Sequence, residues 1–221
     1  MDIDLSPIFN NWRFLASGLL LTVVLSASTM AGAAVVGLGI GIGRSYGPKW
    51  LTVPLTFYVD SMRAIPVLVV LVWTFFAVPI VTGLALPPFW AALVALTAHI
   101  AAYVAEIVRA GIASVRPGQT RAGLALGMSR AQVVRKIVLP QAIIRMLPAF
   151  GSVLSVTIKD TAIATVIAVP ELMRQSETVA AQSFRPLEVF TTTMLIFFFL
   201  LFPVTRGVDM LYRRVAHLGR S

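Results

Sequence analysis

The chain has 221 residues, of which 58% are hydrophobic and only 12% are charged, and its mean hydropathy is +0.88. A soluble domain carries about 25% charged residues, so this composition predicts one domain that lies in lipid. Cysteine is absent, which excludes disulfides, thiolate catalysis and cysteine-based zinc sites. The net charge of +9 would suggest nucleic acid in a soluble protein. In a membrane protein basic residues mark topology, so we expect no nucleic-acid partner.

We expect the chain to begin with an uncleaved span rather than a signal peptide. Asp2 and Asp4 stand where a signal peptide carries positive charge. The apolar stretch that follows is longer than the core of a signal peptide and has no clear cleavage site. Residues 14–43 contain no charged side chain. About 20 apolar residues cross the hydrocarbon core, so this stretch predicts a first membrane-spanning helix.

Four further spans follow along the chain. Residues 64–105 also contain no charged side chain, but Pro79, Gly83, Pro87 and Pro88 interrupt them and predict a turn between two helices. Two more apolar stretches lie beyond residue 140. The predicted helices cover about 16–42, 53–80, 89–112, 141–168 and 188–211. The expected fold class is therefore all-α, a polytopic membrane protein with five transmembrane helices in a single domain over residues 1–221.

The distribution of basic residues predicts the orientation of these helices. Most of the 18 lysines and arginines lie in the loop after the first span, in and beside the segment 113–140, or in the C-terminal tail. Only Arg13, Arg174 and Arg185 fall on the other side of the membrane. Because basic residues are retained in the cytoplasm, we expect the N-terminus outside and the C-terminus in the cytoplasm.

The segment 113–140 predicts two short helices at an angle. A helix over 119–126 ends at Gly127, which adopts the left-handed conformation without steric cost. Ser129 then has the position of an N-cap, and the glutamine three residues later completes a capping box. The second helix meets Pro140, which predicts a bend into the next span.

The same segment resembles the EAA motif of ABC-importer permeases, in which nine residues separate a glycine from I-x-L-P. In this chain the motif consists of Arg121-Ala122-Gly123, Gly127 and Ile137-Val138-Leu139-Pro140, with nine residues between Gly127 and Ile137. Arg121 replaces the acidic residue of the motif. Three more segments resemble the polar-amino-acid branch of these permeases: Ser61–Pro66, Ala102–Ile112 and Lys159-Asp160-Thr161.

The resemblance implies a type I ABC importer fold in which the segment 113–140 couples the permease to an ATPase. The residues that match the coupling motif are Gln119, Arg121, Ala122, Gly123, Ala125, Gly127, Ser129, Leu139 and Pro140. In the family this loop docks into a cleft of the ATPase subunit. Arg121 therefore removes one ion pair of that contact, while Gly127 and the apolar packing residues are retained.

The resemblance also implies the partners and the mechanism. We expect a dimer of ATP-binding-cassette ATPases that binds ATP and Mg, a second permease that is identical or similar to this chain, and an extracytoplasmic amino-acid-binding protein. The chain would lie in the bacterial cytoplasmic (inner) membrane, surrounded by lipid, and bind no cofactor itself. It would be a transport subunit rather than an enzyme, and would move its substrate by alternating access.

Placing an ionisable residue inside a membrane span costs free energy, so we expect each such residue to have a partner of opposite charge. Asp60 and Arg63 share a helical face and form an ion pair in one interpretation. In the other, Arg63 holds the carboxylate of a substrate, for which its planar guanidinium is suited. Glu106 pairs with Arg109 or Arg63, or receives a substrate ammonium group.

Lys159 and Asp160 are the strongest substrate candidates, with Thr161 beside them. Neighbours in a helix point about 100° apart, so at least one of the two charges needs another partner. An amino acid supplies a carboxylate for Lys159 and an ammonium for Asp160. The alternative is pairing with a second copy of the chain, or with Arg174 or Glu177.

Two further features favour a packing role. His99 is alone in an apolar stretch, where a hydrogen-bonded packing role is more common than ligand binding. The glycines of the run 37–43 superficially resemble a nucleotide-binding loop, but no strand precedes them and no Lys-Ser/Thr follows. Small residues four apart let helices approach closely, so we interpret this run as a packing surface. We find no metal-ligand cluster in the sequence.

The predicted function is the permease subunit of an amino-acid importer. The run from Arg63 to Trp73 and the non-acidic EAA loop resemble the glutamate/aspartate type of these permeases, and the basic residues within spans also favour an anionic substrate. One alternative is the same importer fold with another amino acid or derivative as ligand. Another is an ion-coupled secondary carrier, which would not explain the EAA spacing. A small membrane enzyme is a third, and it lacks a catalytic constellation.

Overall fold

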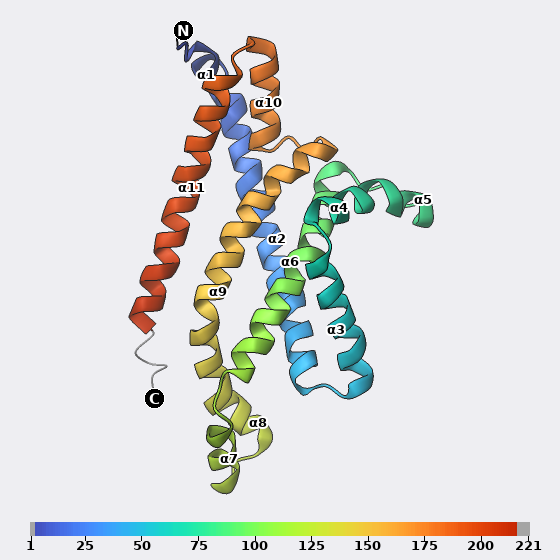
Figure 1. Cartoon of the computed structure of the whole chain (residues 1–221), viewed down its shortest axis with the longest axis vertical. Coiled ribbons are helices and arrows are strands. Elements are labelled where there is room, and N and C mark those ends of the chain that lie inside the picture. Colours follow the sequence, from blue (N-terminus) through green and yellow to red (C-terminus); the bar gives the residue numbers. More distant parts are fainter. Residues whose placement is uncertain (1–2, 216–221) are drawn as a thin grey trace.

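The computed structural model describes residues 3–215, in which every regular element is a helix. The four longest lie lengthwise in an elongated bundle (Figure 1). The short helices α7 and α8 lie at one end, here called the loop end, and α1 and α10 lie at the other. The helices are α1 Ser6–Asn10, α2 Trp12–Tyr46, α3 Lys49–Ala64, α4 Val67–Val72, α5 Val78–Thr82, α6 Pro88–Ala113, α7 Pro117–Ala125, α8 Arg130–Val133, α9 Leu139–Asp160, α10 Leu172–Ser183 and α11 Pro186–Val215. Three turns of other pitch connect some of them: the π turns Trp73–Ala77 and Val134–Val138, and the 3-10 turn Thr161–Ile167.

Four continuous helical stretches among the described residues are long and apolar enough to cross a membrane. They are α2, α6, the stretch Arg130–Ile167 that contains α9, and α11, and they cover the predicted spans 16–42, 89–112, 141–168 and 188–211. The apolar window of α6 is 61% buried within the chain, whereas that of α11 is 17% buried. Helix α6 is therefore the centre of the bundle, and α11 presents most of its surface to lipid or to another protein.

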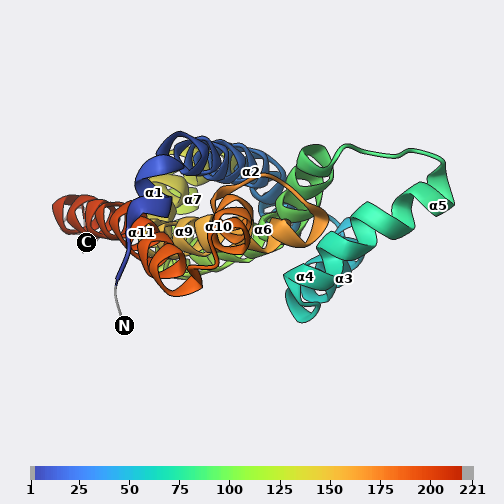
Figure 2. The same cartoon turned by 90° about the horizontal axis from the view of Figure 1, so that it is seen from above.

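The span predicted over 53–80 is a broken helix pair and not one straight helix, because the chain bends by 107° between α3 and the stretch Val67–Thr82. Ile65 has an extended backbone, with φ −87° and ψ 132°. A residue before proline is driven out of the helical region, and Pro66 has no N–H to continue the hydrogen-bond ladder. Figure 2 shows α3, α4 and α5 on the side of the bundle opposite α11. The broken pair takes the place of the fifth span.

The bend predicted at Pro140 takes a different form. The chain runs from Arg130 to Ile167 as one helical stretch of 38 residues. A π turn over Val134–Val138 comes immediately before Pro140, and the N–H of Leu139 bonds to the carbonyl of Val134. In a regular α-helix the proline ring clashes with the carbonyl four residues earlier. The extra residue in the wide turn makes room for the ring, so the helix continues.

At the end opposite the loop end, Glu171 caps α10. Its carboxylate accepts hydrogen bonds from the N–H groups of Met173 and Arg174, both at 2.8 Å. The next N–H, of Leu172, bonds to the hydroxyl of Thr22 in α2 at 3.1 Å. Burial raises the pKa of Glu171 to about 7, against the lowering effect of the two amide hydrogen bonds. Burial thus opposes the ionised form of the cap, and the two amide groups favour it.

The glycine run at the end of α2 is a packing surface, as predicted. A Cβ atom on Gly37 would lie 2.6 Å from Val104 and 2.7 Å from the carbonyl oxygen of Ala101 in α6. A Cβ atom on Gly41 would lie similarly close to Val108 and to the carbonyl oxygen of Ala105, one turn further along α6. Gly39, between them, has no heavy atom within 4 Å of its ideal Cβ position. Two glycines four residues apart thus bring α2 into contact with the backbone of α6.

We predict that Gly37→Ala and Gly41→Ala each destabilise the folded chain, because the methyl group must push against backbone atoms of α6. Overpacking of this kind costs about 1–3 kcal/mol. Gly39→Ala is the matched control and should be neutral or slightly stabilising. The loss of monodisperse protein on heating in detergent, followed by size-exclusion chromatography, measures the difference. Equal melting of all three variants would contradict this packing account.

Candidate functional site

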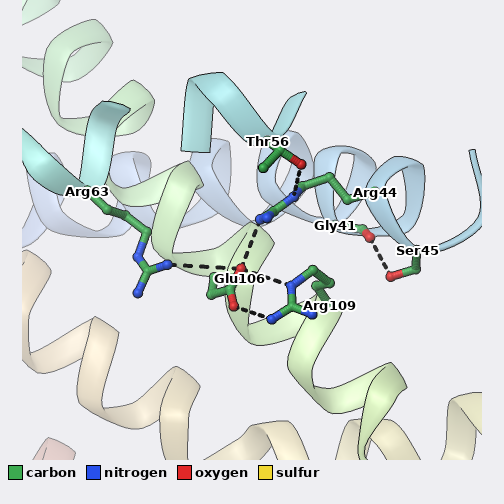
Figure 3. A network of polar contacts seen from close by, with 7 residues as sticks. All are labelled: Gly41, Arg44, Ser45, Thr56, Arg63, Glu106 and Arg109. Carbon is green, nitrogen blue, oxygen red and sulfur yellow. Dashed lines mark hydrogen bonds and ion pairs between the residues drawn. The ribbon is translucent and has the colours of Figure 1, made fainter. Parts of the chain in front are cut away.

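Four charged residues from three helices meet where α2, α3 and α6 approach one another, and we call them the Glu106 cluster (Figure 3). Glu106 of α6 accepts a hydrogen bond from Arg44 of α2 at 2.9 Å. Arg109, one turn further along α6, donates two hydrogen bonds, one to each oxygen of the same carboxylate. Arg63 of α3 lies 4.0 Å away. The cluster ties α2 and α6 together and brings the end of α3 beside them.

The cluster carries more positive than negative charge, since three guanidinium groups share one carboxylate. Arg44 is the most buried, with a side chain 8% exposed, and it also donates to Thr56 at 3.2 Å. Arg63 is 40% exposed and lies over the ring of Tyr103, 5.8 Å from its centroid. Arg63 is therefore the least engaged arginine, and a cation–π contact supplies part of its stabilisation.

The predicted Asp60–Arg63 ion pair is not formed. Asp60 is exposed, and none of the ion pairs within 4.0 Å in residues 3–215 includes it. Glu106 was expected to pair with Arg109 or Arg63, or to receive a substrate ammonium. In the structure its oxygens are engaged by Arg44 and Arg109, and it also faces a cavity, described below.

A cavity of about 550 Å³, here called the break cavity, opens where α3 ends and α4 begins. Its wall includes the backbone of the break, from Arg63 to Val67, together with residues of α6 and α9. Arg63 and Asp160 both line it, although they are far apart in the sequence. Asp160 has no ion-pair partner within 4.0 Å among the described residues. The cavity therefore presents one cation, whose nearest carboxylate is that of Glu106 at 4.0 Å, and one anion that has no ion-pair partner among the described residues.

Lys159 and Asp160 do not face the same space. Lys159 lines a separate cavity of about 400 Å³ between α9 and α11, together with Thr205 and Asp209. The hydroxyl of Thr161 is buried and donates to the carbonyl of Ile158 at 2.7 Å. Arg174 and Glu177, considered as alternative partners for the Lys159–Asp160 step, lie 3.6 Å from each other instead. A single substrate bridging both Lys159 and Asp160 therefore does not fit this arrangement.

His99 lines the break cavity. This position was not predicted from the sequence. Its side chain is buried and lines the cavity, and its ring lies 5.3 Å from that of Tyr103. Its Nδ1 atom is buried without a hydrogen-bond partner in the described part of the chain, so the expected hydrogen-bonded packing is not found at that atom. An isolated histidine in an apolar run gives no signal of this, because only the break at Pro66 places the cavity beside it.

As predicted, the segment 113–140 contains a short helix, α7, that ends before Gly127, and a second helix that begins after Ser129. The second helix is not short, because it continues through Pro140 into α9. Ser129 caps α8, and the reciprocal bond from the Gln132 side chain completes the capping box. Gly127 has φ +80°, and the N–H of the following Met128 reaches back to the carbonyl of Gly123 at 3.1 Å. Gly123 is buried, and a Cβ atom there would lie 2.8 Å from Ile137. The two glycines thus fix the angle between α7 and the helix that follows.

The rest of the predicted coupling residues form an open surface. Gln119 is half-buried, and the exposed members are Arg121, Ala122, Ala125, Gly127, Ser129, Leu139 and Pro140. Leu126 joins them with 82% exposure. Arg121 makes no ion pair within residues 3–215. The surface is made of small and apolar residues around one cation.

We predict that Gly127→Ala loosens this segment, because a side chain at positive φ costs about 1–2 kcal/mol. Gly118→Ala is a matched control, since Gly118 also has open space around its ideal Cβ position but no positive φ. Hydrogen exchange of the amides of residues 123–128 should become about five- to thirty-fold faster in Gly127→Ala only. The same acceleration in both variants would count against the left-handed turn as the cause.

The chain matches known proteins over nearly its whole length. Residues 33–217 match the family model described as binding-protein-dependent transport system inner membrane component. The chain is 36% identical to the glutamine transport system permease protein GlnP of Escherichia coli (strain K12), with 97% of each chain covered. It is 33% identical to the octopine transport system permease protein OccM of Rhizobium radiobacter, covering 96% of this chain and 89% of that one.

A solved structure extends the likeness to three dimensions. The chain superposes on one described as the crystal structure of an amino acid ABC transporter with histidines, with a TM-score of 0.91 and 31% sequence identity. The match covers 97% of this chain and all of the other. The sequence resemblance identified from the EAA spacing is therefore confirmed, and the chain belongs to the family of inner-membrane components of binding-protein-dependent transport systems.

Proposed function

We propose that the chain is the permease subunit of an ATP-driven importer of polar amino acids, and that the break cavity holds the substrate within the membrane. Membrane components of such systems are transport subunits and not enzymes. The observation that carries the proposal is that two opposite charges, Arg63 and Asp160, line one cavity of about 550 Å³. Volumes of this order are typical of small-molecule sites.

The chemistry of the wall suits a zwitterion. The guanidinium of Arg63 pairs with a carboxylate through two parallel hydrogen bonds, and Asp160 receives an ammonium group. Irregular backbone at membrane depth is tolerated where it is buried in protein or lines an aqueous cavity. The interrupted helix between Ile65 and Pro66 meets that condition, because its residues line the break cavity.

The two charges of the break cavity match only the amino and carboxylate groups of the substrate and do not specify its side chain. An acidic ligand was predicted in part from the basic residues within spans, Arg63 and Lys159, but these two residues line different cavities. The names of two relatives refer to glutamine and octopine transport. We therefore place a neutral polar amino acid such as glutamine beside glutamate and aspartate as a candidate.

We assign each partner to a surface of the bundle. We place the loop end in the cytoplasm, where the surface around Arg121 docks on a dimer of ATPases that binds ATP and Mg. The opposite end, with α1 and α10, faces the binding protein that delivers the substrate. Helix α11, with 17% of its apolar window buried, has surface available for a second permease, identical or similar. Movement of the α7–α8 segment with the ATPases would then alternate the access of the cavity.

The test is uptake by proteoliposomes that contain the complete transporter, with radiolabelled glutamine and glutamate as separate substrates. Arg63→Gln and Asp160→Asn should each lower uptake at low substrate concentration by about ten- to a hundred-fold, since each removes a charged hydrogen bond worth about 1.5–3 kcal/mol. Asp60→Asn is the matched control, because Asp60 is exposed and lines neither cavity that contains Arg63. Normal uptake by Arg63→Gln and Asp160→Asn would refute the break cavity as the substrate site.

A further inference from the structure

A second cavity lies between α6 and α9 on the loop-end side of the break cavity, and we call it the lower cavity. Its volume is about 470 Å³. Arg63 and Tyr103 line both cavities, so these two side chains stand at the boundary between them. The polar side chains of the lower cavity also include Glu106, Ser114, Arg145 and Ser152.

The wall of the lower cavity has an excess of positive charge. The carboxylate of Glu106 is engaged by Arg44 and Arg109, which leaves Arg63 at 4.0 Å. Arg145 donates to the backbone carbonyl and the hydroxyl of Ser114, which are neutral. The described residues provide no carboxylate within 4.0 Å of Arg145. Two arginines on one cavity, whose single carboxylate is already engaged by two other arginines, favour an anionic occupant, because guanidinium groups bind carboxylates through charge-assisted hydrogen bonds.

The remaining wall limits the size and kind of occupant. Apolar side chains such as Ile107, Met146 and Val153 form much of the surface, and Ala110 and Ala149 leave room between them. A space of this volume accommodates an amino acid together with water. The wall suits a small organic molecule with a carboxylate at one end.

We propose that the lower cavity is a second station for the transported amino acid, in which Arg63 and Arg145 hold its carboxylate before release at the loop end. The proposal rests on the proposed function. Arg63 lines both cavities, so it can keep hold of the carboxylate while the rest of the molecule passes from one to the other. Arg145 then replaces it as the partner on the side of exit.

The position of this station links it to the coupling segment. Ser114 is the C-cap of α6 and lies immediately before α7, whereas Arg145 lies in α9, beyond α8. The hydrogen bond from Arg145 to the carbonyl of Ser114 therefore closes the base of the whole α7–α8 segment. A carboxylate that draws Arg145 into the cavity competes with that bond. Substrate that accumulates at the loop end should consequently slow ATP hydrolysis by the partner.

The experiment measures ATP hydrolysis by the complete transporter in nanodiscs, where both ends of the bundle are accessible, with an excess of ligand-loaded binding protein. Free transported amino acid is then added up to millimolar concentrations. The native protein should be inhibited. In Arg145→Gln and in Ala149→Phe, which fills the cavity, the inhibitory concentration should rise at least ten-fold. Rates are expressed relative to each variant without free amino acid, so a variant with a lower starting rate remains informative.

Arg206→Gln is the matched control, since Arg206 is exposed on α11 and does not line the lower cavity. It should be inhibited like the native protein. Absence of inhibition in the native protein, or equal inhibition of Arg145→Gln, would overturn the second station. A lower hydrolysis rate in nanodiscs with phosphatidylglycerol than in nanodiscs without it, with no further effect of the amino acid, would assign the cavity to a lipid headgroup and also overturn the second station. Failure of the binding protein to stimulate hydrolysis at all would instead count against the proposed function.

Discussion

The break between Ile65 and Pro66 is the constraint on which the arrangement of the interior depends. Proline interrupts the helix in the middle of an otherwise apolar stretch, and the two halves diverge by 107°. Backbone that is not helical must line protein or a cavity when it lies at membrane depth. The break therefore opens a space beside α6 and α9, and it leaves Arg63 at the end of α3, on the wall of that space.

The Glu106 cluster complements the break by holding the surrounding helices in place. One carboxylate joins arginines of α2 and α6 and lies near that of α3, so it links the three helices. The same arrangement leaves Arg63 weakly paired. Arg63 and Arg145, which closes the base of the α7–α8 segment, both line the lower cavity, so the wall of that cavity carries positive charge toward the loop end.

Much of this could be predicted from the sequence, because local signals decide it. Four of the membrane-spanning helices were predicted from long stretches with few charged residues. The turn between α7 and α8 was predicted from the glycine at position 127 and the capping residue Ser129. The break at Pro66 also had a local signal, but composition alone suggested a continuous span. The different directions of Lys159 and Asp160, and the orphan Nδ1 of His99, depend on which helices pack against which face. Such contacts between distant segments have no signature in a single sequence.

The most direct test of the central claim uses the absence of cysteine from the chain. Ala64→Cys places a single thiol on the wall of the break cavity, and Leu84→Cys places one in the exposed loop after α5. The rate of labelling by a water-soluble maleimide is measured during turnover, with and without saturating amino acid. The account predicts that the amino acid slows labelling at residue 64 at least several-fold and leaves residue 84 unchanged. Equal labelling of residue 64 in both conditions would contradict it.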